Sequence, residues 1–116
     1  MKSQEFYVDP GWKNPYLVWN QNYRFERKAY RGFFGSYNSF GYVRLLYESK
    51  LFTLIQYTNT NSGGAWKVGS WSLDQFKGKN IIIEFATEKM RTAAGQGPSY
   101  FWYILDVQIV PDYHPE

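Results

Sequence analysis

Alternation of apolar and polar residues predicts strands over much of this chain. Residues 22–31 alternate between an aromatic-containing face and a polar face, which indicates a half-buried strand. Residues 42–48 and 51–58 are two runs rich in β-branched and aromatic residues. Because only residues 49–50 separate these runs, we expect them to form a hairpin.

Two later segments predict strands of the core. Residues 80–87 place three large apolar side chains on one face, namely Ile81, Ile83 and Phe85. Residues 100–110 carry a wholly apolar face opposite Trp102, and we expect that face to lie in the core. It consists of Phe101, Tyr103, Leu105, Val107 and Ile109.

The remaining segments predict the connections and the fold class. Residues 1–21 contain two prolines and no sustained periodicity, which favours an irregular N-terminal arm or an edge strand. Residues 59–64 predict a polar loop, residues 65–68 a short strand, and residues 88–99 a long polar connection. Seven or eight short strands without a long helix predict one all-β domain over residues 1–116, an antiparallel β-sandwich of the jelly-roll type.

The composition supports this class and adds one unusual feature. Aromatic residues make up 22% of the chain, and they outnumber Val, Ile and Leu together. Aromatic side chains suit half-buried pleated surfaces, so this bias favours strands over helices. We expect some of the rings to lie on the surface, because they exceed what a small core needs.

The inventory of reactive residues excludes most kinds of catalysis. The chain has no cysteine, which excludes disulfides, thiolate zinc sites and cysteine nucleophiles. Its single histidine, His114, lies near the C-terminus and is a poor candidate for a catalytic base or a metal ligand. Only Glu84 and Asp106 could form a glycosidase-like carboxylate pair, provided that their strands are neighbours. We therefore expect no enzymatic activity, and we assign no catalytic or metal-binding residue.

Two segments carry a family resemblance. Residues 71–79 read Trp-Ser-Leu-Asp-Gln-Phe-Lys-Gly-Lys before a strand, and residues 101–109 form an aromatic strand with a central aspartate. This third of the chain resembles the C-terminal part of MAM-like and galactose-binding-like jelly-roll domains. In the turn, Leu73 and Phe76 are expected to close one end of the sandwich, and Gly78 to adopt a positive φ.

The resemblance implies a binding role rather than a reaction. Such domains are usually non-catalytic, and they bind glycans or mediate adhesion, which implies an extracellular or surface-exposed module of a larger protein. Leu105 stands where the family commonly has the first aspartate of a pair. Calcium requires several oxygen ligands, so this hydrocarbon side chain disfavours a calcium site, and we expect no cofactor.

Exposed rings near polar loops point to carbohydrate as the ligand. Trp66 and Trp71 flank residues 67–70, which we take as a connection, beside the polar loop at residues 59–64. An indole can cover the apolar face of a pyranose while amide or guanidinium groups bind its hydroxyls. The alternative is that these tryptophans close the end of the sandwich. The candidate glycan-binding residues are Trp66 as the platform, Trp71 and Trp102 as supporting rings, and Asn61, Arg91 and Gln96 as hydroxyl partners.

Two other functions stay open. A basic cluster at Arg24, Arg27, Lys28 and Arg31 suggests single-stranded nucleic acid, but the net charge is only +3 and alternation sends Arg24 and Arg27 to opposite faces. These two features disfavour nucleic acid as a partner. The second alternative is a structural protein of a virion or another surface assembly, a homo-oligomer whose surplus rings are buried between subunits. The starting Met1, the lack of a secretion signal and the aromatic-rich, proline-containing arm before Asn22 favour this alternative. No apolar stretch is long enough to span a membrane.

Overall fold

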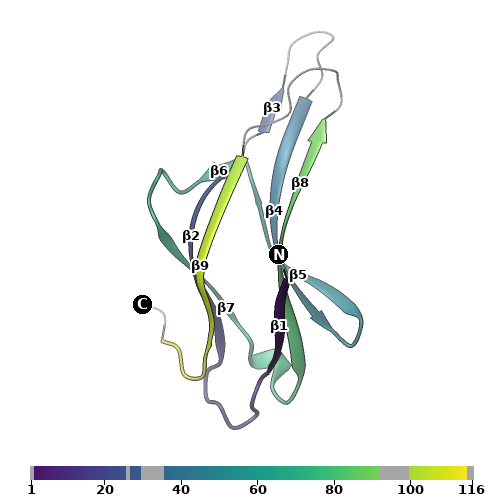
Figure 1. Ribbon diagram of the computed structural model, residues 1–116, viewed down its shortest axis with the longest axis vertical. Coiled ribbons are helices and arrows are strands. Elements are labelled where there is room, and N and C mark those ends of the chain that lie inside the picture. Colours follow the sequence, from purple (N-terminus) through teal and green to yellow (C-terminus); the bar gives the residue numbers. More distant parts are fainter. Residues whose placement is uncertain (1, 26, 30–35, 92–99, 115–116) are drawn as a thin grey trace.

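The computed structural model describes the chain except for residues 1, 26, 30–35, 92–99 and 115–116. The described residues form two antiparallel sheets that face each other, as Figure 1 shows, and the predicted all-β sandwich is confirmed. The elements are β1 (Lys2–Tyr7), β2 (Tyr16–Phe25), β3 (Arg27–Ala29), β4 (Ser36–Tyr47), β5 (Lys50–Thr58), β6 (Thr60–Asn61), β7 (Lys67–Ser72), the 3₁₀ helix η2 (Asp74–Phe76), β8 (Asn80–Arg91) and β9 (Tyr100–Val110).

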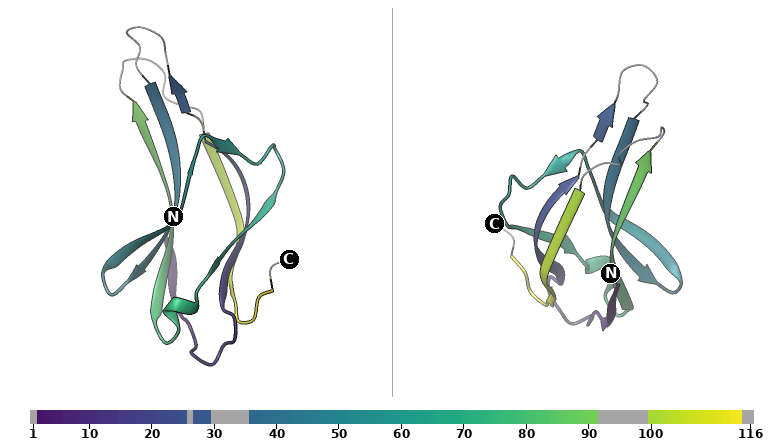
Figure 2. Two further views of the ribbon diagram at one scale, coloured as in Figure 1. Left: turned by 180° about the vertical axis from the view of Figure 1, so that it is seen from behind. Right: turned by 45° about the horizontal axis from the view of Figure 1, so that its top comes forward.

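The first sheet has five strands. Its order is β1-β8-β4, and the far side of β4 is shared by β3 and β5. β4 and β8 pair from Tyr37 opposite Arg91 to Leu46 opposite Ile82, so they form the long centre of this sheet. At one end β3, β4 and β8 extend beyond the second sheet, as the views in Figure 2 also show. The edge strand expected among residues 1–21 is present as β1.

The second sheet has four strands around β2. β9 pairs with one side of β2, and β7 and β6 pair with the other. β2 begins at Tyr16, six residues before the expected strand, so the expectation that residues 16–21 are irregular or at an edge is wrong. The physical reason is that Tyr16, Leu17, Val18 and Trp19 are all apolar, which hides the period-two pattern of a central strand.

The core lies between the two sheets. Trp19 of β2 is fully buried, and the inward side chains of β4 and β8 pack with it. The predicted core face of residues 80–87 is confirmed, because Ile81 and Ile83 are fully buried and Phe85 is nearly so. Leu73 and Phe76 are buried at the turn around η2, and Gly78 has φ +79°, as the turn sequence predicts.

The β4–β5 hairpin is also confirmed. Its two-residue turn is Glu48–Ser49, one residue earlier than expected, and Tyr47 pairs with Lys50. The φ angles of Glu48 and Ser49 are 49° and 64°, and positive values at both positions belong to the turn type that suits the twist of tight hairpins.

The segment after the polar loop differs from the expectation. Residues 59–64 contain the short strand β6, and residues 67–70, expected to be a connection, belong to the strand β7. β7 pairs with β2 from Lys67 opposite Gln21 to Ser72 opposite Tyr16. The sequence obscured this strand because its inward position Gly69 has no side chain and lies against Trp19.

β9 has the predicted bounds, but the predicted inner face is wrong over its first half. The register with β2 shifts between the pairs Val18–Gln108 and Asn20–Leu105, where Asp106 has φ +55°. This bulge inserts one extra residue and reverses which side chains face the core. As a result Trp102, Ile104, Val107 and Ile109 pack on the core, whereas Tyr103 and Leu105 are exposed.

Candidate functional site

The outer face of the four-stranded sheet carries a row of polar side chains on β2. Side chains alternate between the two faces of a strand. Because Trp19 and Gln21 are buried in the core, Asn20, Asn22 and Arg24 face outward. β2 thus presents two amides and a guanidinium in line along the middle of this face.

β9 places apolar side chains directly beside this polar row. The cross-strand partners are Phe101 with Arg24, Tyr103 with Asn22, and Leu105 with Asn20. Tyr103 exposes 59% and Leu105 54% of its surface. We call these three pairs the outer rows. Successive rows are two residues apart, which corresponds to about 7 Å along a strand.

Each outer row continues on the far side of β2. The neighbours there are Asn61 beside Arg24, the Gly64 carbonyl beside Asn22, and Val68 beside Asn20. In every row, a polar residue of β2 therefore lies between an apolar side chain of β9 and a residue of the segment that runs from β6 to β7.

The loop that bears Trp66 is held firmly against β2. The Ser62 hydroxyl donates to Asn22 Oδ1 at 2.8 Å and accepts the N–H of Tyr23 at 3.1 Å, and the Ser62 N–H donates to the Tyr23 carbonyl at 2.9 Å. Asn22 Nδ2 donates to the Gly64 carbonyl at 3.3 Å. These bonds order the loop that presents Trp66, whose side chain remains half exposed (50%).

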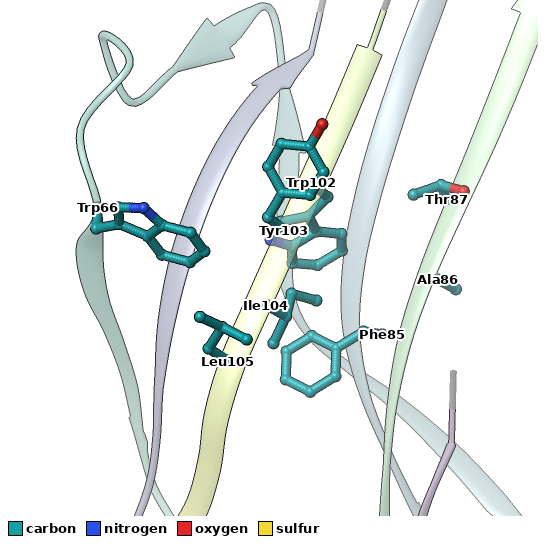
Figure 3. Close-up of a pocket in the computed structure, with 8 residues that line it drawn as sticks. All are labelled: Trp66, Phe85, Ala86, Thr87, Trp102, Tyr103, Ile104 and Leu105. Atoms are coloured by element: carbon teal, nitrogen blue, oxygen red, sulfur yellow. The ribbon is translucent and has the colours of Figure 1, made fainter.

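A hollow of about 610 Å³ lies beside the outer rows, and Figure 3 shows its lining. It is lined by Trp66, Phe85, Ala86, Thr87, Trp102, Tyr103, Ile104 and Leu105. Tyr103 and Leu105 border it from the outer side of β9, whereas Trp102 and Ile104 border it from the inner side. The hollow thus follows the edge of β9, and Trp66 reaches toward Leu105 from across β2 (Figure 3).

A second hollow, of about 330 Å³, lies at the first outer row. It is lined by Tyr23, Arg24, Asn61, Gly63, Gly64 and Phe101. Asn61 Oδ1 accepts the N–H of Gly63 at 2.8 Å, which shapes the rim. Phe101 stacks on Tyr103 with ring centroids 5.2 Å apart and an interplanar angle of 28°. These two rings connect the second hollow with the first.

The structure brings two of the predicted site residues to this face and moves a third into the core. Trp66 lines the larger hollow and Asn61 the smaller one. Trp102 touches the larger hollow only from inside, because its ring packs edge-on against Phe25, Tyr57 and Phe85 at 5.5–5.7 Å. Its Nε1–H donates to the buried Gln21 Oε1 at 3.0 Å. Trp102 is therefore a core ring that supports the site rather than a surface ring.

The other three predicted residues do not join them. Trp71 is 37% exposed, but it pairs opposite the buried Leu17, which places it on the inner side of the edge strand β7 and outside both hollows. Arg91 ends β8 in the five-stranded sheet. Gln96 lies outside the described residues.

The outer rows are not predictable from the sequence. The alternation of residues 100–110 predicts Tyr103 and Leu105 in the core, and no pattern marks Asn20 and Asn22 as their partners. The one available signal was Asp106, a lone acid within an apolar run. Its left-handed φ and its hydrogen bond from Asn20 Nδ2 at 3.2 Å mark the bulge that turns the apolar side chains outward.

A buried polar cluster fixes the inner wall of the larger hollow, which is the side that Trp102 lines. Gln21 is only 3% exposed, and its Nε2 donates to the Tyr57 hydroxyl at 3.1 Å. Burial raises the pKa of the Tyr57 phenol above its ordinary value of 10.0. Tyr57 is therefore protonated throughout the physiological pH range, and the cluster holds Trp102 in place without a charged group.

The candidate carboxylate pair is not assembled. Glu84 lies on β8 in the five-stranded sheet, where Arg44 Nη1 is 3.4 Å and Lys2 Nζ 3.9 Å from its carboxylate. Asp106 lies on β9 in the other sheet, so the two strands are not neighbours. Within the part of the chain that the structure describes, no group of three or more histidine or acidic side chains is placed to hold a metal ion.

The basic cluster is divided between the sheets. Arg24 faces outward from β2, whereas Arg27 and Lys28 belong to β3 of the five-stranded sheet. Arg31 lies outside the described residues. The described members therefore do not line one continuous strand surface of the kind that binds single-stranded nucleic acid.

Comparison with known proteins adds no assignment. No protein-family model matches the chain, and no curated protein matches it significantly. In the described ranges no helix has the length and apolar character needed to cross a membrane.

Proposed function

We propose that this protein is a non-catalytic module that binds carbohydrate on the outer face of its four-stranded sheet. The observation that carries the proposal is the pairing in the outer rows, where Phe101, Tyr103 and Leu105 lie beside Arg24, Asn22 and Asn20. Sugars present apolar C–H faces and hydroxyl edges on the same ring. A surface that alternates rings with amides at neighbouring positions matches both features.

The roles of individual residues follow from their positions. Trp66 and Tyr103 are exposed rings on which pyranose faces stack. Asn61 and Arg24 bind hydroxyls at the smaller hollow, and the Asp106 carboxylate, which accepts from Asn20, accepts hydroxyls at the opposite end. Three rows about 7 Å apart suit several units of an extended glycan better than a single sugar.

The outer rows also suit a module that meets glycans on a cell surface or a particle surface. Trp66 is on a loop that hydrogen bonds anchor to β2, so the platform is already ordered before the ligand arrives. Preorganisation of this kind reduces the entropic cost of binding. No catalytic group is needed for this function.

Affinity electrophoresis in gels that contain different polysaccharides, followed by a glycan array, tests the proposal. Trp66→Ala and Tyr103→Ala are each expected to weaken binding about fivefold or more, since stacking on one ring is worth about 1 kcal/mol or more. Tyr7→Ala is the matched control, because Tyr7 is 53% exposed but lies on β1 of the other sheet, outside both hollows.

The control variant should bind like the unaltered protein, and all three variants should keep its thermal unfolding midpoint. If the wild type is retained by a polysaccharide and both Trp66→Ala and Tyr103→Ala migrate identically to it, the outer rows are not the binding site. If no glycan of either assay binds the wild type, the function itself is wrong.

A further inference from the structure

β9 has a hydrogen-bonding edge that no described strand occupies. It pairs with β2 along one side, and no other pairing of β9 is formed among the described residues. In Figure 1 β9 lies in front of β2, with this edge toward the viewer. The open edge borders the larger hollow, where Trp102 and Ile104 remain only partly buried.

The first half of this edge has none of the usual protection against pairing. Residues 100–105 contain no charge, no proline and no glycine, and they run without a bulge up to Asp106. Other outer strands differ: β1 carries Lys2 and Glu5 and an irregular register, and β7 carries Lys67 and Gly69. β5 is uncharged over residues 51–58, but its pairing with β4 has a register shift in the middle of the strand. Long, regular, apolar edges normally pair with another strand.

We infer that residues 100–105 pair with the same residues of a second copy of this chain, antiparallel about a two-fold axis. An antiparallel edge is complementary to itself, so the same surface serves on both copies. The absence of charge in this segment means that no like charges meet, although the whole chain carries +3. Aromatic cross-strand pairs would add to the backbone hydrogen bonds.

This pairing would cover two exposed features of the monomer. It supplies partners for the backbone groups of β9, and it brings the hollows of the two copies together so that Trp102 and Ile104 are covered. Asp106 ends the paired segment, because its bulge with φ +55° interrupts the regular strand.

The dimer would also join the two outer faces into one continuous sheet. The two β9 columns of Phe101, Tyr103 and Leu105 would lie side by side at its centre, flanked by the β2 columns. The inference does not depend on carbohydrate binding. Only about six residues of each copy pair, so the area that each copy buries is smaller than the roughly 800 Å² per partner of a standard stable interface. We therefore expect a dimer with a dissociation constant in the micromolar range.

The natural absence of cysteine allows a direct test by crosslinking. Phe101→Cys, Tyr103→Cys and Leu105→Cys are prepared as single variants and incubated in a glutathione redox buffer, alone and in pairwise mixtures. For any axis position from 101 to 105, one of these combinations places two outward cysteines opposite each other, at a Cα separation that a disulfide accepts. Val68→Cys is the matched control, because Val68 is 61% exposed on the same face but away from this edge.

We expect one combination to form a disulfide dimer at least about tenfold faster than Val68→Cys does, and the unaltered protein to show a concentration-dependent monomer–dimer equilibrium by sedimentation. Tyr103→Lys should abolish that equilibrium, because it sets like charges close to the axis, whereas Val68→Lys should not. A wild type that stays monomeric up to submillimolar concentration overturns the inference. So does a dimer in which no β9 combination crosslinks faster than the control. Trp66→Ala separates this inference from the proposed function, because it should weaken glycan binding and leave the dimer unchanged.

Discussion

Gly69 lies directly opposite Trp19, and the missing side chain makes room for the indole. A Cβ atom at Gly69 would lie 2.2 Å from Cε2 and 2.6 Å from Nε1 of Trp19. Trp19 is fully buried and its ring packs edge-on against Phe85 at 5.5 Å, so it has no space to retreat. β7 can therefore lie this close to the Trp19 ring only because residue 69 has no side chain.

Gly69→Ala should therefore destabilise the protein strongly for so small a change. We expect the free energy of unfolding to fall by about 1–3 kcal/mol, the usual cost of overpacking a core. Urea denaturation measures it, and Gly11→Ala is the control, because a Cβ there meets only the Asp9 Oδ1 atom at 3.2 Å. Equal midpoints for the two variants would contradict the close packing of Gly69 on Trp19.

The bulge at Asp106 should depend on a residue that tolerates a left-handed backbone. Asp106→Asn keeps that tolerance and the polar contact with Asn20, so we expect nearly unchanged stability. Asp106→Val should lower the free energy of unfolding by about 1–2 kcal/mol, because a β-branched residue is strained at positive φ. Thermal unfolding of the two variants decides the matter, and a Val variant as stable as the Asn variant would exclude a bulge at this position.

Removal of the Gln21 side chain should lower the free energy of unfolding by more than the loss of one hydrogen bond would. Gln21 accepts from Trp102 Nε1 and donates to the Tyr57 hydroxyl, and all three groups lie at the inner wall. Gln21→Ala leaves two polar groups without their partner, each at a cost of about 1–3 kcal/mol. In Gln21→Ala/Tyr57→Phe one of these orphans is absent, so the double variant should be more stable than Gln21→Ala alone. Additive losses in a double-mutant cycle would show that Gln21 and Tyr57 do not interact.

Tyr57 should make the protein sensitive to alkali. Burial holds the pKa of Tyr57 above 10.0 in the folded state, whereas the unfolded chain releases that proton near 10. The stabilising contribution is complete below about pH 10 and declines as the pH rises through the folded pKa, because the unfolded state then binds fewer protons. Unfolding curves recorded from about pH 8 to about pH 11 should show this loss, and Tyr57→Phe should show a smaller one. An identical pH slope in the two proteins would contradict the role of Tyr57.

The fold class and several local features could be predicted from the order of the residues. Period-two patterns identify the hairpin of β4 and β5 and the core face of β8, because one strand face meets the core and the other does not. The turn around Leu73, Phe76 and Gly78 was also predictable, since burial of two apolar residues and a positive φ are local requirements. Trp66 was recognisable as a surface ring because it sits beside a polar loop.

Which rings form the candidate site depends instead on how the strands pair in the folded protein. A bulge of one residue at Asp106 reverses the faces of β9, and whether a strand has a bulge depends on its pairing partner rather than on its own alternation. The same partner, β2, brings Asn20 and Asn22 beside Leu105 and Tyr103 across more than eighty positions of sequence. Local patterns carry no information on such pairings, because a hydrogen-bonded register is a property of two strands and not of one.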